Sequence, residues 1–243
     1  MSRPLVVLTT AQGSFAGLAA LLDDKGFDVL ASPLLTFREP ADWSPVDQLI
    51  RCWLDTPVVA LTSPRAAQAL VDRAAHLGMT LGHGPAVWAG GPATGAVLSS
   101  HIPGVMVPTG DGRAGLTVAR AILEAGVPDS VVFACGDRHL DDLPTTLQAS
   151  GVPVEEVVCY RSDLASNETA RRAIAGAQVI VAGSPRLAGL LAEVRQPGSD
   201  ASLVAVGPST AEAARRAGWP AAAVAAEPSS SRVAEAVASV FHE

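Results

Sequence analysis

Two pairs of short turns carry hydroxyl side chains where a buried strand is expected to end and a helix to begin. The first pair is Thr-Ser-Pro-Arg at residues 62–65 and Gly-Ser-Pro-Arg at residues 183–186. The second pair is Gly-Pro-Ala-Thr at residues 91–94 and Gly-Pro-Ser-Thr at residues 207–210. A helix N-terminus offers backbone N–H groups and a partial positive charge, and a hydroxyl adds a further donor. These turns therefore predict binding sites for small anions such as carboxylates.

The side chains of these turns have two interpretations. Ser and Thr are favoured N-caps, so capping alone accounts for their positions, and a surface Arg is most often simply solvated. In the functional interpretation the same groups contact an anionic ligand, because hydroxyl donors and the guanidinium fork both suit carboxylates. The candidate ligand-binding residues are Ser63, Arg65, Thr94, Arg138, Ser184, Arg186, Ser209 and Thr210.

Tyr160 is the one tyrosine of the chain and lies at the end of a predicted strand over residues 154–159. It either packs at an interface with its hydroxyl in water or faces a ligand, to which a phenol can donate a proton. The sequence has no Walker motif, no Gly-x-Ser-x-Gly elbow and no His-Glu-x-x-His pair, and its five histidines lack metal-ligand spacing. We therefore expect neither a nucleotide cofactor nor a metal.

The elements that position these residues are expected to be duplicated. Val-Val-Leu at residues 6–8 matches Val-Val-Phe at residues 131–133, an offset of 125, and the two pairs of turns have offsets of 121 and 116. Offsets that shrink in chain order indicate tandem copies with shorter loops in the second. Short apolar runs alternate with helical segments, which is typical of parallel strands covered on both faces. The predicted fold class is α/β, with two doubly wound parallel-sheet domains from an internal duplication.

Each copy is predicted to contain five strands. Those of the first copy are at residues 5–8, 28–30, 58–61, 86–89 and 105–107, and those of the second at residues 131–134, 154–159, 178–182, 203–206 and 222–225. Two stretches predicted to be irregular, residues 37–45 and 161–167, follow the second strand of each copy. We interpret them as points where the chain crosses between two domains. Each domain would then contain segments of both copies of the repeat.

The composition excludes several classes of function. A net charge of −7 disfavours nucleic acid as a partner, because phosphate neutralisation needs a basic face. No apolar run reaches the roughly 20 residues of a membrane helix. The three cysteines are widely spaced and form no Cys-x-x-Cys motif, which indicates a reduced, cytoplasmic setting.

Several segments together resemble one protein family. They are Thr-Ser-Pro-Arg-Ala-Ala at residues 62–67, Gly-Asp-Arg at 136–138, Gly-Val-Pro-Val at 151–154 with Val-Cys-Tyr-Arg at 158–161, and Ala-Val-Gly-Pro-Ser-Thr-Ala at 205–211. In this order and spacing the chain resembles uroporphyrinogen-III synthase over nearly its whole length. One departure is the turn after the first strand, where members often carry Arg-Pro and this chain has Thr9 and Thr10.

The resemblance implies two discontinuous domains joined by a two-stranded linker, with a substrate cleft between them. Domain 1 would contain residues 1–36 and 164–243, domain 2 residues 41–158, and the linkers residues 37–40 and 159–163. The substrate would be hydroxymethylbilane, a linear tetrapyrrole rich in carboxylates. The product would be uroporphyrinogen III, a closed ring in which the last pyrrole is inverted.

The resemblance also implies a reaction without cofactor or metal, in which Tyr160 donates a proton to the leaving hydroxyl and the turns bind acetate and propionate groups. Holding the reacting atoms in register can supply ~7–11 kcal/mol of the barrier. The alternative is a non-catalytic two-domain binding or regulatory protein for an anionic small molecule, because the same turns serve binding without chemistry. The acidic surface and the internal duplication favour a monomer.

Overall fold

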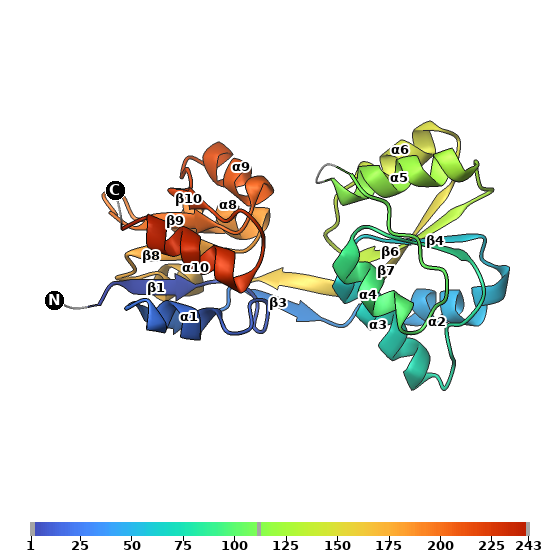
Figure 1. Ribbon diagram of the computed structural model, residues 1–243, viewed down its shortest axis with the longest axis horizontal. Coiled ribbons are helices and arrows are strands. Elements are labelled where there is room, and N and C mark those ends of the chain that lie inside the picture. The colour runs from blue at the N-terminus through green and yellow to red at the C-terminus, as the bar shows by residue number, and fades with distance from the viewer. Residues whose placement is uncertain (1–2, 111–112, 242–243) are drawn as a thin grey trace. The chain divides into compact units, whose positions relative to one another are not determined.

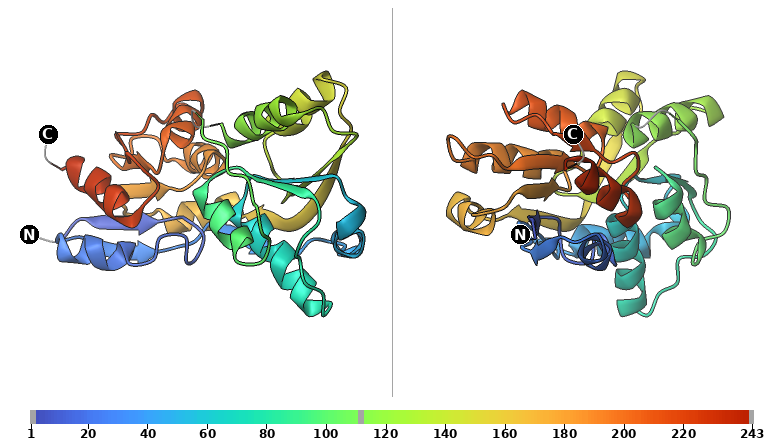
Figure 2. Two further views of the ribbon diagram at one scale, coloured as in Figure 1. Left: turned by 45° about the vertical axis from the view of Figure 1, so that its right-hand side comes forward. Right: turned by 60° about the vertical axis from the view of Figure 1, so that its left-hand side comes forward.

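Figure 1 shows the computed structural model, which describes residues 3–110 and 113–241. The chain divides into two compact units, the first made of Met1–Phe37 and Asp163–Glu243 and the second of Arg38–Ser162. Each unit has one five-stranded sheet with helices on both faces (Figures 1 and 2). The predicted α/β fold class, with two sheets dominated by parallel strands, is confirmed.

In the sheet of the first unit, each pair of neighbouring strands is parallel. Its spatial order is β10-β9-β8-β1-β2, with β1 at Leu5–Leu8, β2 at Asp28–Ala31, β8 at Val179–Ala182, β9 at Ser202–Ala205 and β10 at Ala223–Val224. In the register, Val6 of β1 lies opposite Val29 and Val179. The central strands are almost wholly apolar because helices bury both of their faces.

Alternation along β8 shows which helices cover which face. Val179 and Val181 pack with α1 (Leu18–Asp24) and α10 (Ser230–Ser239). Ile180 and Ala182 point the other way and join a second cluster. The helices of that second face are α7 (Asn167–Ala173), α8 (Pro185–Val194) and α9 (Pro208–Arg216).

The second unit repeats this arrangement. Its sheet has the order β3-β7-β6-β4-β5, with β3 at Leu35–Arg38, β7 at Val154–Leu164, β6 at Val131–Gly136, β4 at Val58–Leu61 and β5 at Ala86–Ala89. One face is covered by α2 (Ser44–Arg51), the 3₁₀ turn η1 (Trp53–Asp55), α3 (Pro64–His76) and α4 (Pro92–Ser99). The other is covered by α5 (Ala114–Ala125) and α6 (Asp142–Ala149).

Strands from the two predicted copies are exchanged between the sheets. The first sheet combines β1 and β2 of the first copy with β8, β9 and β10 of the second. The second sheet combines β4 and β5 of the first copy with β6 and β7 of the second. The equivalent turns of the duplication therefore lie in different units.

Two expectations about individual segments were wrong. The stretches predicted to be irregular contain strand: Phe37 and Arg38 end β3, and β7 continues to Leu164. The two strands are neighbours in the sheet, and just beyond them the Ala165 N–H donates to the Leu34 carbonyl at 2.9 Å, so their backbone groups satisfy one another.

The predicted strand at residues 105–107 was also wrong. It is reduced to a single bridge between Met106 and Trp88. Pro103 and Pro108 flank it, and proline cannot donate to a ladder of hydrogen bonds.

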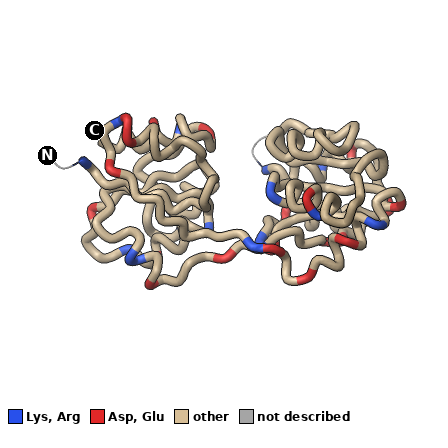
Figure 3. Tube along the Cα trace, turned by 90° about the horizontal axis from the view of Figure 1, so that it is seen from below, with Lys and Arg blue, Asp and Glu red and all other residues tan. Residues whose placement is uncertain are grey.

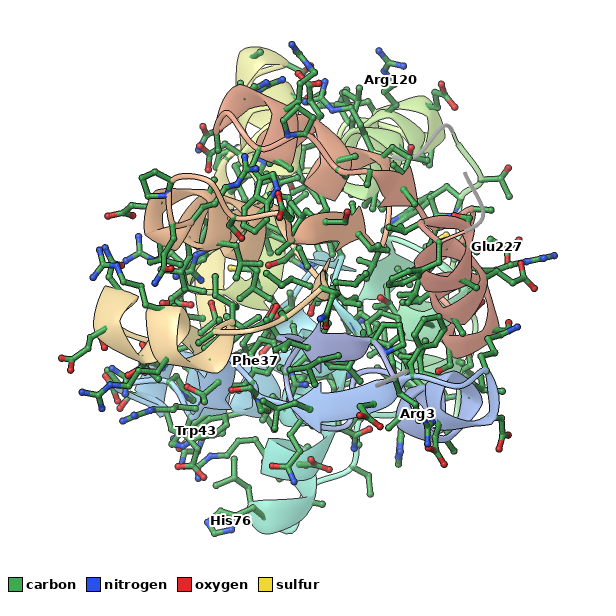
Figure 4. All side chains as sticks on the ribbon, turned by 90° about the vertical axis from the view of Figure 1, so that its left-hand side faces the viewer. Arg3, Phe37, Trp43, His76, Arg120 and Glu227 are labelled. Carbon is green, nitrogen blue, oxygen red and sulfur yellow. The ribbon has the colours of Figure 1, made fainter. Side chains whose placement is uncertain are left out.

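An ion pair ties α2 to α3 in the second unit. Arg73 donates from Nε to Asp47 Oδ1 at 2.6 Å and from Nη2 to Asp47 Oδ2 at 2.9 Å. The guanidinium also lies 4.8 Å from the ring centroid of Trp43, whose side chain is labelled in Figure 4. The hydrogen bonds from Arg73 hold the pKa of Asp47 below its ordinary value.

The charged residues of both signs are interspersed along the trace of each unit (Figure 3). Among the described residues, no helix is both long enough and apolar enough to cross a bilayer.

Candidate active site

The predicted site residues lie just beyond the carboxyl ends of strands in both units. In the second unit, Ser63, Thr94 and Arg138 follow β4, β5 and β6. In the first unit, Ser184 follows β8 and Thr210 follows β9, and these two strands are adjacent. This is the edge at which open α/β sheets bind ligands.

Tyr160 lies in β7 directly against Gly136, the last residue of β6. The register pairs these two residues just after an irregularity between Cys135 and Gly136. A Cβ atom added at Gly136 would lie 2.7 Å from the hydroxyl oxygen of Tyr160 and 2.8 Å from Cε2. The aromatic ring therefore occupies the space that any side chain at position 136 would need.

The hydroxyl of Tyr160 lies 3.2 Å from Oγ of Ser63. Ser63 is the N-cap of α3, and its Oγ also accepts from the Ala66 N–H at 3.4 Å. A hydroxyl has one proton and two lone pairs, so Ser63 can accept from Ala66 while donating to the phenol. With that orientation Tyr160 retains its own proton for transfer.

The loop after β6 fixes the backbone on both sides of Tyr160. The Asp137 N–H donates to the Tyr160 carbonyl at 3.0 Å. Oδ1 of Asp137 accepts from the Ser162 N–H at 2.9 Å and from its hydroxyl at 3.3 Å. No role was predicted for Gly136, Asp137 or Ser162, although Gly-Asp-Arg is visible as a motif, because the contacts between β7 and the end of β6 are not local in sequence.

Thr94 and Thr210 occupy the same position in two equivalent helices. Each is the third residue of its helix, α4 or α9, and each is 2% exposed. The N-caps are Gly91 and Gly207, which have no side chain to accept from the first-turn amides. Within residues 3–110 and 113–241, neither threonine hydroxyl makes a hydrogen bond with another residue.

The other predicted residues differ in their surroundings. Ser184 caps α8 by accepting from the Leu187 N–H at 3.3 Å. Arg65 is the second residue of α3, and Arg186 is the second residue of α8. Ser209 is the second residue of α9 and is exposed. The Arg138 side chain is 66% exposed, with Asp137 3.8 Å away. The structure thus joins Ser63 to Tyr160 directly, whereas the arginines remain candidates by position.

The two cysteines nearest this site cannot serve as nucleophiles at neutral pH. Burial raises the pKa of both Cys135 and Cys159 to about 12. The thiolate is the reactive form, and at neutral pH both groups stay protonated. The two residues also belong to clusters on opposite faces of the sheet.

The sequence matches the profile of one known protein family. The family profile described as uroporphyrinogen-III synthase HemD matches residues 16–235. The chain belongs to the uroporphyrinogen-III synthase family. As a member of this family it is an enzyme of tetrapyrrole biosynthesis, which confirms the resemblance seen in the sequence.

Solved structures of uroporphyrinogen III synthases share the fold. A mutant enzyme from the extremely thermophilic bacterium Thermus thermophilus has a TM-score of 0.71 at 16% identity, with 98% of this chain and 99% of that chain covered. The enzyme from Helicobacter pylori has a TM-score of 0.63 at 16% identity, with the same two coverages. No curated protein matches the sequence.

In the turn after β1, which departs from the family's Arg-Pro pattern, Thr9 and Thr10 pack against residues in and just after β8. Thr9 is fully buried and donates from Oγ1 to the Val181 carbonyl at 2.7 Å. Thr10 lies over Gly183, where an added Cβ would be 2.6 Å from the threonine methyl group. Both hydroxyl-bearing residues therefore stabilise the contact between β1 and β8 in this uroporphyrinogen-III synthase homologue.

Proposed function

We propose that Tyr160 is the general acid in the conversion of hydroxymethylbilane to uroporphyrinogen III. The observation that carries this proposal is the 3.2 Å contact between its hydroxyl and Ser63 at the start of α3. Family membership supports the reaction, and the contact of the phenol with the N-cap of α3 supports its role.

The first chemical step would be loss of the substrate's terminal hydroxyl. Tyr160 donates its proton to this group, water leaves with the electron pair of the broken C–O bond, and the adjoining pyrrole becomes a protonated azafulvene that keeps its N–H. The phenolate that remains lies beside the first turn of α3, where the partial positive charge of the helix and the Ser63 hydroxyl stabilise it. The proton is returned when the closed ring regains aromaticity.

The second requirement is control of which carbon attacks. The substituted carbon of the last pyrrole must attack first, giving a spiro intermediate that fragments and recloses with this ring inverted. Positioning of this kind is a matter of binding, and holding the reacting atoms in register can contribute ~7–11 kcal/mol. Carboxylate contacts along the substrate would supply it.

The first turns of α4 and α9 are the strongest candidates for those contacts. Their amides lack a side-chain cap, and Thr94 and Thr210, each 2% exposed as a residue, bring hydroxyls to the same turns. Ser63 and Ser184, in contrast, already use their oxygens as helix caps. We assign carboxylate binding chiefly to the two threonine turns, with Ser209, Arg65, Arg138 and Arg186 as supporting groups.

The finer assignments remain part of the proposal. We propose a cytoplasmic monomer that needs no cofactor, with residues 1–36 and 164–243 as one domain and residues 41–158 as the other. Residues 37–40 and 159–163 would then be the linkers. Two observations support this assignment: β3 pairs with β7, and the boundaries between the two compact units fall just after Phe37 and just after Ser162.

Replacing Tyr160 by Phe tests the proposal. The change removes one oxygen and keeps the ring, so the thermal unfolding midpoint should barely change. General acid catalysis contributes ~10²–10⁴-fold, and because this leaving group is labile we expect kcat to fall by about 10²-fold. Full synthesis of uroporphyrinogen III by a folded Tyr160→Phe variant would show that the phenol is structural.

A further inference from the structure

Position 136 is occupied by glycine although its backbone does not demand one. Gly136 is the last residue of β6, and its φ lies outside the left-handed region that favours glycine. The position has no side chain because the Tyr160 ring fills the space: its Cζ atom lies nearest to where a Cβ would be, with the hydroxyl oxygen at 2.7 Å and Cε2 at 2.8 Å. The glycine therefore serves close approach and not chain conformation.

Ser63 contacts the hydroxyl group at the same end of this ring. Its oxygen lies 3.2 Å from the phenol and 3.4 Å from the Ala66 N–H. The first turns of α3 are anchored in the core, because Ala66, Ala67 and Leu70 are fully buried. The phenol is thus located by a hydroxyl that is fixed to a rigid element of the unit.

We propose that Gly136 and Ser63 are positioning residues that together select the rotamer of Tyr160 used in the reaction. A side chain at position 136 would push the ring away from β6, and loss of the Ser63 hydroxyl would release its polar end. Neither residue needs to touch the substrate for this effect. The catalytic consequence rests on the proposed function of Tyr160, whereas the effect on the ring does not.

Because the chain has one tyrosine, the ring can be observed directly. Full-length protein carrying tyrosine labelled with carbon-13 at Cζ should give a single phenol resonance. Gly136→Ala and Ser63→Ala should each shift or broaden this resonance. Gly136→Ala collides with a side chain and not with backbone, so we expect the unit to remain folded. Should it not fold, Ser63→Ala alone carries the test.

The matched control is Ser229→Ala. Ser229 caps α10 in the other unit through a bond of 3.4 Å to the Arg232 N–H, the same length as the cap made by Ser63. This variant loses an equivalent cap and should leave the resonance of Tyr160 in place. Ser63→Thr keeps the hydroxyl and should restore the original resonance.

Kinetics separate positioning from binding. Gly136→Ala should lower kcat by roughly the same factor as Tyr160→Phe, about 10²-fold, with KM little changed. The double variant Gly136→Ala/Tyr160→Phe should be no slower than Tyr160→Phe alone, because both changes disable one group.

Two results would overturn the inference. One is an unchanged resonance in folded Gly136→Ala and Ser63→Ala, and the other is full additivity of the two kinetic losses. If instead Tyr160→Phe were fully active while both variants still shifted the resonance, the positioning would stand and the catalytic role of the phenol would fail.

Discussion

At the residue scale, four turns that look alike in sequence use their hydroxyls differently. Ser63 and Ser184 cap their helices, at 3.4 Å and 3.3 Å from the third amide. Thr94 and Thr210 are third residues that follow glycine N-caps, and they are buried without a cap role. A hydroxyl so placed gains from a charged acceptor, which is why we assign carboxylate binding to the threonine turns.

Thr210→Val is expected to weaken substrate binding without unfolding the protein. Valine keeps the buried volume and removes the hydroxyl, and a hydrogen bond to a charged group contributes about 1.5–3 kcal/mol. KM should therefore rise by roughly 10- to 150-fold, as measured by steady-state kinetics. Thr210→Ser, which keeps the oxygen, should lie close to the natural protein.

An unchanged KM in a folded Thr210→Val variant would contradict the assignment. Thr94→Val provides the internal comparison, because Thr94 has the same place in α4 that Thr210 has in α9.

The sequence identified Tyr160 as a candidate because it is the one tyrosine and follows the predicted strand at residues 154–159, whereas β7 continues past it to Leu164. The groups that hold it were not identified as such. Gly136 lies far from Tyr160 along the chain, and the contact arises only through the register of β6 with β7. Ser162 meets Asp137 for the same reason. Spacing rules reveal helical neighbours and local caps, but they cannot reveal which residues a strand register brings together.

At the element scale, the predictions succeeded where a strand is a short apolar run between helices. Val58–Leu61 is buried at every position and was predicted with the observed bounds. The helices α2 and α7 were missed, and each begins at the end of a stretch that was interpreted as a crossing. The sequence does contain start signals for both helices. Pro45 lies in the first turn of α2, and Ser166 caps α7 by accepting from the Thr169 N–H.

The tie between α2 and α3 should make stability depend on pH. Arg73 lowers the pKa of Asp47 below its ordinary value of 3.8. A depressed folded-state pKa contributes stability that is fully present above the unfolded value and is lost as the pH falls through the folded value. Asp47→Asn should therefore lower the unfolding midpoint at neutral pH, with a difference that shrinks below about pH 4.

Thermal melts of both proteins across this range provide the measurement. Asp55→Asn, which removes an exposed carboxylate from the same unit, should give a difference that is small at neutral pH. A midpoint difference for Asp47→Asn that is independent of pH would contradict the role of the ion pair.

At the scale of the whole molecule, the exchange of strands between the copies predicts which fragments can fold. Residues 38–162 are continuous and retain β4, β5, β6 and β7 with helices on both faces. A fragment of residues 1–120 would contain β1 and β2 without their neighbour β8. We expect residues 38–162 alone to unfold in one cooperative transition by circular dichroism, and residues 1–120 to show no such transition.

The opposite result, with residues 1–120 and 125–243 each folding as a compact half, would contradict the exchanged arrangement. The predicted substrate cleft stays a prediction, since fragment folding bears on the units and not on the space between them.

The reaction is expected to proceed without a metal. A chelator present throughout the assay should leave kcat unchanged. Loss of activity that a divalent ion restores would replace the phenol mechanism with one based on a bound cation.

The most direct test of the account is the identity of the product. Freshly prepared hydroxymethylbilane is incubated with the protein, and the cyclised isomers are separated by chromatography. Because the substrate closes spontaneously to the symmetric isomer, any inversion must come from the protein. We predict that uroporphyrinogen III predominates and that its formation scales with protein concentration. Formation of the symmetric isomer alone, at the rate seen without protein, would contradict the account and favour a binding protein for anionic small molecules.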